Sequence, residues 1–154
     1  MIDSPPQPGF IIVTHGEIGH ALLAVARYIL GQELPHFAAV SVPFMGEMTN
    51  IIPPNSPAPF AQRQRLIADR INEARNRVDS GGGVVVLTDV LGGTSFTTAR
   101  ELFSPEQGVM VAGVNLPMVL KASELNGLTP AAAAEQLVDR TRRAIVSARG
   151  QGSG

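Results

Sequence analysis

The stretch FIIVTHG, residues 10–16, is an apolar run that ends in a histidine where an amphipathic segment begins. A short apolar run of this kind predicts a buried strand. In a parallel α/β protein, ligands and chemistry lie at the carboxyl ends of the strands, because the loops and helix amino termini that follow converge there. The stretch therefore predicts a strand that carries His15 into a functional site.

A second run of the same kind, VVVLTD, covers residues 84–89 and ends in Asp89. The following segment, residues 90–95, reads VLGGTS and combines a glycine pair with two hydroxyl side chains. If the two strands are neighbours in one sheet, an imidazole and a carboxylate meet beside a glycine loop and two helix starts. These two strand ends form the candidate site.

The length and composition of the chain are those of one globular domain that can bury a core. Of its 154 residues, 44% are apolar and 16% are charged. A formal net charge of −1 gives no reason to expect nucleic acid or an anionic membrane as a partner. The chain has no cysteine, which excludes disulfide and thiolate chemistry.

The proline-rich start of the chain does not have the pattern of a signal peptide. No segment approaches the roughly 18 apolar residues that a membrane span needs. We therefore expect a cytoplasmic protein without direct membrane insertion. We also expect residues 1–8 to form a flexible leader, residues 9–149 the domain, and residues 150–154 a disordered tail.

The segment between two expected strands, residues 10–14 and 37–42, has the spacing of an amphipathic helix. Gly31 is its expected carboxyl cap. The apolar stripe of this helix is expected at Ile18, Leu22, Val25 and Ile29. Two strands joined in this way form a β-α-β unit, which is nearly always right-handed.

Residues 43–59 interrupt this alternation, because their recurring prolines remove hydrogen-bond donors and fix backbone angles. We expect a long loop, and loops of more than about 12–15 residues tend to be functional or mobile. One interpretation is an inert surface insertion. The other is a flap near the site or at a subunit contact, which exposed apolar side chains would suit: Phe44, Met45, Met48, Ile51 and Ile52.

Residues 61–78 predict a helix with an apolar face and, on another face, arginines at seven-residue spacing. The apolar face consists of Ile67, Ile71, Ala74 and Val78; the arginines are Arg63, Arg70 and Arg77. A basic stripe can steer an acidic partner, but it is more often a solvated face. The glycines at 81–83 precede a strand and lack the lysine of a phosphate-binding P-loop, so they indicate a turn.

The rest of the chain continues the alternation with a helix, a strand at residues 109–112 and two final helices. The expected amino-terminal caps are Thr94 or Ser95 and then Asn115. Gly127 is expected to end the fourth helix, and Thr129-Pro130 to open the last one. The apolar stripe of the last helix is expected at Ala134, Val138, Thr141 and Ile145. This order predicts an α/β fold with three layers, α/β/α: a mainly parallel sheet of four to five strands with helices on both faces.

His15 and Asp89 can act together. A carboxylate that accepts a hydrogen bond from one ring N–H fixes the tautomer, leaves the other ring nitrogen as a nucleophile and stabilises positive charge on the ring. Backbone amides at helix amino termini have no internal partners and attract phosphate. The expected phosphate-binding positions are Gly16, Gly92, Gly93, Thr94 and Ser95.

These residues suit phosphorylation of a histidine, and they also suit a hydrolase that uses histidine as a base. The chain has no Gly-x-Ser-x-Gly elbow and no cysteine nucleophile, which counts against the hydrolase. A lone histidine at a strand end is more often structural. With the carboxylate and the glycine pair at a second strand end, a functional role and a structural role are about equally good interpretations. We expect His20 and His36 to be structural or solvated, and no acidic cluster indicates a metal site.

Three segments in order resemble the mannose-family EIIA domain of the bacterial phosphoenolpyruvate-dependent sugar phosphotransferase system. They are residues 9–16 with their Thr-His-Gly ending, residues 84–95 with LTDVLGGT, and residues 112–118, AGVNLPM. Together these motifs cover about residues 9–146. Any one of them alone would be a weak signal.

The resemblance implies a cytoplasmic phosphocarrier, usually a homodimer, that accepts a phosphoryl group from the phosphohistidine of HPr and passes it to a separate EIIB protein. His15 would be the phosphorylated residue and Asp89 its orienting carboxylate, which makes the chain a phosphotransferase with a phosphohistidine intermediate. No metal, nucleotide or other cofactor is implied. Some family members exchange an antiparallel edge strand across the dimer.

The chain departs from the family at Ser95 and Thr97, where members commonly have Pro and Asn. The phosphotransfer subunit of dihydroxyacetone kinase is a similar relative, but its second motif typically reads Gly-Ser-Ala after the aspartate. A second hypothesis is a regulatory binding module. Phosphorylation of His15 would then change the affinity for a target protein, because it adds about −1.5 to −2 charges.

Overall fold

The computed structural model describes residues 6–53 and 55–152, which form a parallel four-stranded sheet in the order β2-β1-β3-β4. The strands are β1 (Gly9–His15), β2 (Phe37–Val42), β3 (Val84–Thr88) and β4 (Gly108–Ala112). All three neighbouring pairs are parallel. Both runs that predicted buried strands therefore lie side by side in the middle of the sheet.

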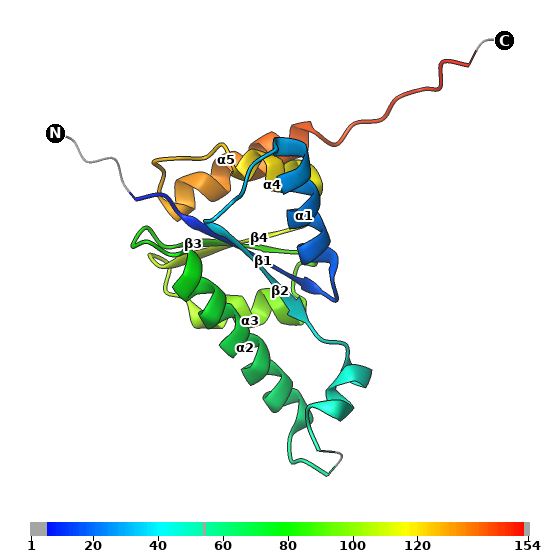
Figure 1. The fold of residues 1–154 in the computed structure, drawn as a ribbon, viewed down its shortest axis with the longest axis vertical. Helices are drawn as coiled ribbons and strands as arrows, with labels where there is room; N and C mark the ends of the chain where they lie inside the picture. Colours follow the sequence, from blue (N-terminus) through cyan, green and yellow to red (C-terminus); the bar gives the residue numbers. More distant parts are fainter. Residues whose placement is uncertain (1–5, 54, 153–154) are drawn as a thin grey trace.

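Helices cover both faces of this sheet, as Figure 1 shows. One layer contains α1 (Ile18–Leu30), α4 (Leu116–Ala122) and α5 (Pro130–Arg143). The other contains α2 (Pro59–Val78) and α3 (Thr94–Leu102). The predicted three-layer α/β/α architecture is confirmed, with four strands in the described part of the chain.

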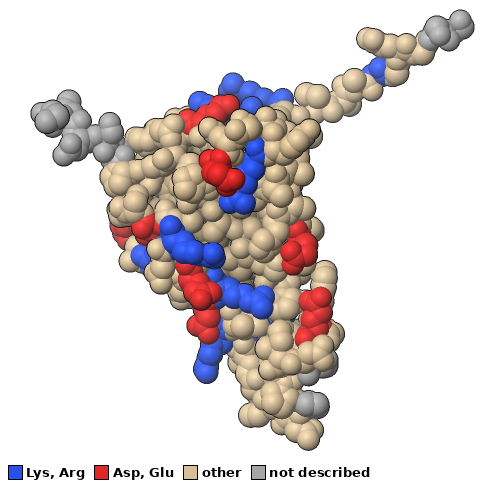
Figure 2. Space-filling model, in the orientation of Figure 1, with Lys and Arg blue, Asp and Glu red and all other residues tan. Residues whose placement is uncertain are grey.

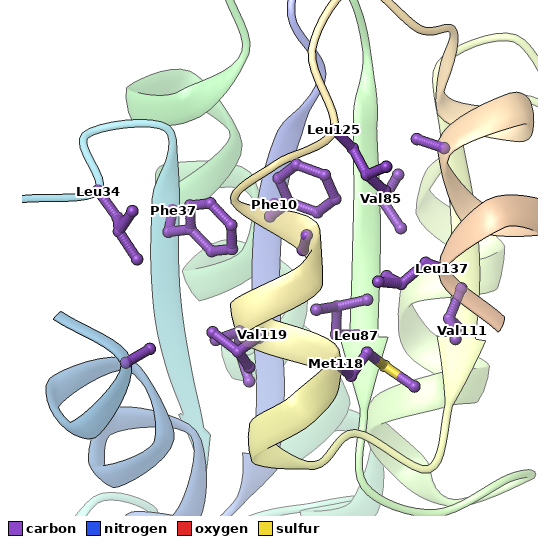
Figure 3. Close-up of a cluster of buried hydrophobic side chains, with 14 of the residues drawn as sticks. Phe10, Leu34, Phe37, Val85, Leu87, Val111, Met118, Val119, Leu125 and Leu137 are labelled. Atoms are coloured by element: carbon purple, nitrogen blue, oxygen red, sulfur yellow. The ribbon is translucent and has the colours of Figure 1, made fainter. Parts of the chain in front are cut away.

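The core is divided in two by the alternation of side chains along the strands. Phe10 and Ile12 of β1 point to the layer of α1, α4 and α5, whereas Ile11 and Val13 point to the layer of α2 and α3. All four are fully buried. Figure 3 shows the first of these clusters, in which Val119 and Met118 of α4 pack over Phe10 and Leu87. Burial on both faces explains why the central strands are continuous apolar runs.

The predicted apolar face of α1 is largely wrong, because of its four residues only Leu22 packs against the core. Ile18, Val25 and Ile29 are about half exposed, and the helix buries Gly19, Leu23 and Ala26 instead. The close contact at Gly19 fits this orientation of the helix. A Cβ at Gly19 would lie 3.0 Å from Thr14 Oγ1 and 3.1 Å from Ile12 Cγ2, tighter than most Cβ contacts, so glycine favours this close approach to β1.

The segment expected as a long loop contains a short 3-10 helix, η1 (Met45–Asn50). Met48 and Ile52 are buried, whereas Phe44, Met45 and Ile51 are exposed. The segment is therefore partly anchored by its own apolar side chains, and only some of the expected exposed set faces solvent.

The predicted helix ends are partly confirmed. Gly31 caps α1 in the left-handed conformation, and Thr129 caps α5 through a hydrogen bond from Ala132 N. The amino-terminal cap of α3 is Gly93, not Thr94 or Ser95, because helical geometry already begins at Thr94.

Two predicted carboxyl-terminal boundaries also need correction. The helix α4 ends at Ala122, several residues before Gly127, which adopts a positive φ of 68° in the turn that follows. Ile145 of the expected last stripe lies beyond the end of α5 and is exposed, whereas Ala134 and Thr141 are buried as expected.

The ends of the chain lie only partly in the described region. Of the expected leader, residues 1–5 are outside it, while Gln7 donates to Asn126 Oδ1 and so contacts the domain. Of the expected tail, residues 153–154 are outside it, and the preceding residues have no regular secondary structure. No helix in the described ranges is long and apolar enough to cross a membrane. On the face shown in Figure 2, basic and acidic side chains are interspersed without an extended patch of one sign.

Candidate functional site

The sheet register brings His15 and Asp89 together. Val13 is opposite Thr88 in the β1–β3 ladder, so the last residue of β1 and the first residue after β3 emerge at the same edge of the sheet. His15 Nδ1 lies 2.8 Å from Asp89 Oδ2, and the backbone N–H of His15 donates to the same oxygen at 2.9 Å. The predicted pair is therefore in direct contact although 74 residues separate its members in the chain.

Asp89 is held by hydrogen bonds at both oxygens. Its Oδ1 accepts from Val90 N at 3.0 Å and from the hydroxyl of Ser95 at 3.3 Å. Burial works to raise the pKa of Asp89, but its hydrogen bonds from His15 and the charge interaction with that ring outweigh burial, so the pKa lies below its usual value. Asp89 is therefore a carboxylate at neutral pH.

An ionised Asp89 determines where the proton of His15 lies. A carboxylate can only accept hydrogen bonds, so Nδ1 must carry the hydrogen that faces it, and in the neutral ring Nε2 then has a free electron pair. No hydrogen bond from the described residues reaches Nε2, and the side chain of His15 is 33% exposed. The arrangement leaves a nucleophilic nitrogen open to an incoming group.

The glycine loop lies beside the imidazole. A Cβ placed on Gly93 would be 3.9 Å from His15 Cε1, and Gly92 has a φ of +75°, a conformation that favours glycine. The amides of Gly92 and Thr94 donate no hydrogen bond within the described chain, and neither residue is buried. They are available to anionic oxygens near the ring.

The other predicted phosphate-binding positions are less free. The N–H of Gly16 donates to Val42 O at 3.1 Å, and that of Gly93 points to Val90 O at a long 3.4 Å. The hydroxyl of Ser95 is used by Asp89, and the side chain is fully buried. Ser95 therefore acts on the carboxylate in this structure.

Exposed apolar side chains surround the mouth of the site. Val90 and Leu91 follow Asp89 directly and are 53% and 74% exposed. Phe44 is also exposed, and its ring lies against Gly16, 3.1 Å from where a Cβ would stand. Ile18, at the start of α1, completes the set, which we call the apolar rim: Ile18, Phe44, Val90 and Leu91.

Arg63 lies near the site but was not among the predicted site residues. The expected solvated arginine stripe is wrong here, because Arg63 is only 7% exposed. Its Nε and Nη2 donate to Pro43 O at 3.1 and 2.9 Å, and its Nη1 donates to Thr94 Oγ1 at 3.3 Å. Arg70, seven residues further along the same face, donates to Ser41 O. Of the three arginines, only Arg77 is exposed. The seven-residue spacing was the one signal in the sequence, because it places Arg63 and Arg70 on the same face of α2, and this face packs against the end of β2.

The two remaining histidines lie outside the site. His20 is exposed near Ser41 and Glu17. Burial lowers the pKa of His36, which packs against Phe10 and Phe37. No group of three or more potential metal-ligating side chains occurs within residues 6–53 and 55–152. Asn115, in the third motif, caps α4 by accepting from Met118 N.

A family model described as "PTS system fructose IIA component" matches residues 59–141, which run from α2 through most of α5. The matched region includes Asp89 and the glycine loop, and His15 precedes it. No curated protein sequence gives a significant match.

Solved structures share the fold over nearly the whole chain. A mannose/sorbose-specific IIA subunit of the phosphotransferase system from Enterococcus faecalis is 24% identical, with a TM-score of 0.68 over 96% of this chain and 99% of that one. A phosphotransferase system component EIIA from Streptococcus agalactiae is 19% identical, with a TM-score of 0.68 over 90% and 95%. A sigma-54 interaction domain protein from E. faecalis is 15% identical, with a TM-score of 0.65 over 92% and 95%.

Proposed function

Because the chain belongs to the EIIA-man family of phosphotransferase system IIA components, we propose that His15 carries a phosphoryl group on Nε2 during sugar phosphotransfer. One observation supports this role above all others. The contact between His15 Nδ1 and Asp89 leaves Nε2 unpaired and partly exposed beside a loop of free amides.

The proposed donor is the phosphohistidine of HPr. The electron pair of His15 Nε2 attacks phosphorus in line, the N–P bond of the donor breaks, and the donor imidazole leaves with the bonding electrons. Positive charge that develops on the His15 ring is stabilised by the Asp89 carboxylate, and the hydrogen on Nδ1 stays in place. The amides of Gly92 and Thr94 hold the phosphoryl oxygens. Transfer to EIIB reverses these bond changes on a new acceptor.

The apolar rim supports a protein as donor and acceptor. A small phosphorylated metabolite would need enclosing polar groups, whereas Phe44 and Leu91 stand exposed beside the site and would be covered by a docked protein. Both proposed partners, HPr and EIIB, are separate proteins of the cytoplasm, and the proposal places this chain there with them. A homodimer is part of the same proposal, and sedimentation analysis would test it.

The proposed function is tested with the purified protein, phosphoenolpyruvate, enzyme I and HPr. We expect an acid-labile mass increase of one phosphoryl group that maps to His15. His15→Ala should take up none, and His20→Ala, an exposed histidine outside the site, should be labelled like the wild type. Equal labelling of His15→Ala would overturn the assignment.

A regulatory binding module is the second candidate, because the same fold occurs in a sigma-54 interaction domain protein. In this case His15 is phosphorylated, but the group is not passed to an EIIB protein. Phosphorylated protein mixed with EIIB proteins separates the two candidates. Loss of label to EIIB supports the carrier, and retained label together with phosphorylation-dependent binding of another protein supports the regulator.

A further inference from the structure

Arg63 is a buried cation without an anionic partner. It is 7% exposed, and no ion pair joins it to a carboxylate of the described residues. A buried charge needs compensating hydrogen bonds or an opposite charge. Two of its nitrogens share the single acceptor Pro43 O, and a third donates to Thr94 Oγ1. This environment supplies polar acceptors but no negative charge.

The contact with Thr94 has a consequence for hydrogen-bond direction. The guanidinium can only donate, so Thr94 Oγ1 is the acceptor and the hydroxyl hydrogen must point elsewhere. No acceptor for that hydrogen occurs among the described residues. Thr94 directly follows Gly93, whose backbone lies beside the His15 ring. The hydroxyl is thus kept as a donor in the first turn of α3, next to free amides.

Arg63 also joins the segments that form the mouth of the site. Pro43 follows Val42, whose carbonyl accepts from Gly16, the residue after His15. One side chain from α2 therefore fixes the exit of β2 and the start of α3 at the same time. Since these two segments flank His15, their spacing determines where the amides and the hydroxyl stand.

We propose that Arg63 is a positioning residue for phosphoryl transfer, which holds the Thr94 hydroxyl as a donor to the phosphoryl group on His15 and supplies positive charge beside it. This inference rests on the proposed function. Phosphorylation brings about two negative charges to a site that already contains Asp89, and Arg63 is the cation hydrogen-bonded to the loop that receives them.

The test is a double-mutant cycle with Thr94→Val, Arg63→Lys and the double variant, measured by single-turnover phosphorylation from phospho-HPr. Each single change should slow transfer by about tenfold or more, because each removes the oriented donor. The double variant should be no more than about twofold slower than the slower single variant, since both changes break the same link. Thr94→Ser keeps the hydroxyl and should restore transfer.

Arg70→Lys is the matched control, because Arg70 lies on the same face of α2 and donates to a backbone carbonyl of β2, as Arg63 does to that of Pro43 just after the strand. It should transfer at the wild-type rate. Thermal unfolding establishes that each variant is folded at the assay temperature. Thr94→Val leaves Arg63 in place, so it tests the link even where Arg63→Lys is too unstable to assay.

The outcomes separate this inference from the proposed function. If the wild type takes up no phosphoryl group on His15, the proposed function fails. If the wild type is labelled but Thr94→Val or Arg63→Lys transfers at its rate, the positioning role alone is overturned. Losses that multiply in the double variant would also overturn it, because independent effects do not pass through a shared hydrogen bond.

Discussion

The carboxylate of Asp89 accepts hydrogen bonds from the ring and the backbone of His15 on one oxygen and from Val90 and Ser95 on the other. Asp89→Asn keeps the size of the side chain but removes the charge that stabilises positive charge on the ring. We expect single-turnover transfer from phospho-HPr to fall by about 10²-fold or more, with the fold retained. Wild-type transfer by this variant, with normal circular dichroism, would show that the carboxylate has no role in the reaction.

The same residue makes stability depend on pH. The pKa of Asp89 is lower in the folded protein than in the unfolded chain, so its contribution to the free energy of unfolding is complete above the unfolded pKa of about 3.9. This contribution is lost as the pH falls through the lower folded pKa. Urea unfolding should therefore show the largest gap between wild type and Asp89→Asn near neutral pH and a smaller gap in acid. A gap that widens on acidification would contradict the lowered pKa.

At the scale of elements, Gly19 lies where α1 comes close to β1. Alanine favours helix by about 1 kcal/mol over glycine, but the added Cβ would press on Thr14 and Ile12, and overpacking costs about 1–3 kcal/mol. We expect Gly19→Ala to lower the free energy of unfolding. Ala24→Gly, at an exposed position of α1, is the control and should lose only the helix-propensity difference. A more stable Gly19→Ala protein would mean that the helix can shift at no cost.

The positions of helices and strands were predictable where residues close in the chain determine them. The central strands are apolar throughout because both faces are buried, and Asn115 and Thr129 cap helices with their own side chains. The face of α1 was not predictable, because it depends on contact between Gly19 and a strand that precedes it. The cap at Gly93 uses no side-chain hydrogen bond, so the hydroxyls at 94 and 95 misled the prediction.

At the scale of the whole molecule, the part of the site that is formed by strand ends could be predicted from the sequence. The part that depends on contacts between a helix and the loops around the site could not. His15 and Asp89 follow apolar runs, and a parallel sheet brings such ends to one edge. Arg63 lies on α2, which covers one face of the sheet, and its burial depends on Pro43 O and Thr94 lying within hydrogen-bonding distance. The seven-residue spacing of the arginines places Arg63 on one face of α2 but does not identify Pro43 and Thr94 as its partners.

The apolar rim is the surface where we expect the molecule to meet a protein donor. Leu91 is 74% exposed, so Leu91→Gln should leave the free energy of unfolding within about 0.5 kcal/mol of the wild type. If a donor covers this side chain, phosphorylation at low phospho-HPr concentration should slow several-fold, by analogy with loss of a buried apolar contact at an interface. At saturating donor the rate should be unchanged, since Leu91 donates no hydrogen bond to the phosphoryl group. Tyr28→Gln, which removes an even more exposed side chain near the carboxyl end of α1, should change neither rate. A loss confined to the saturating rate would place Leu91 in the chemistry and not in docking.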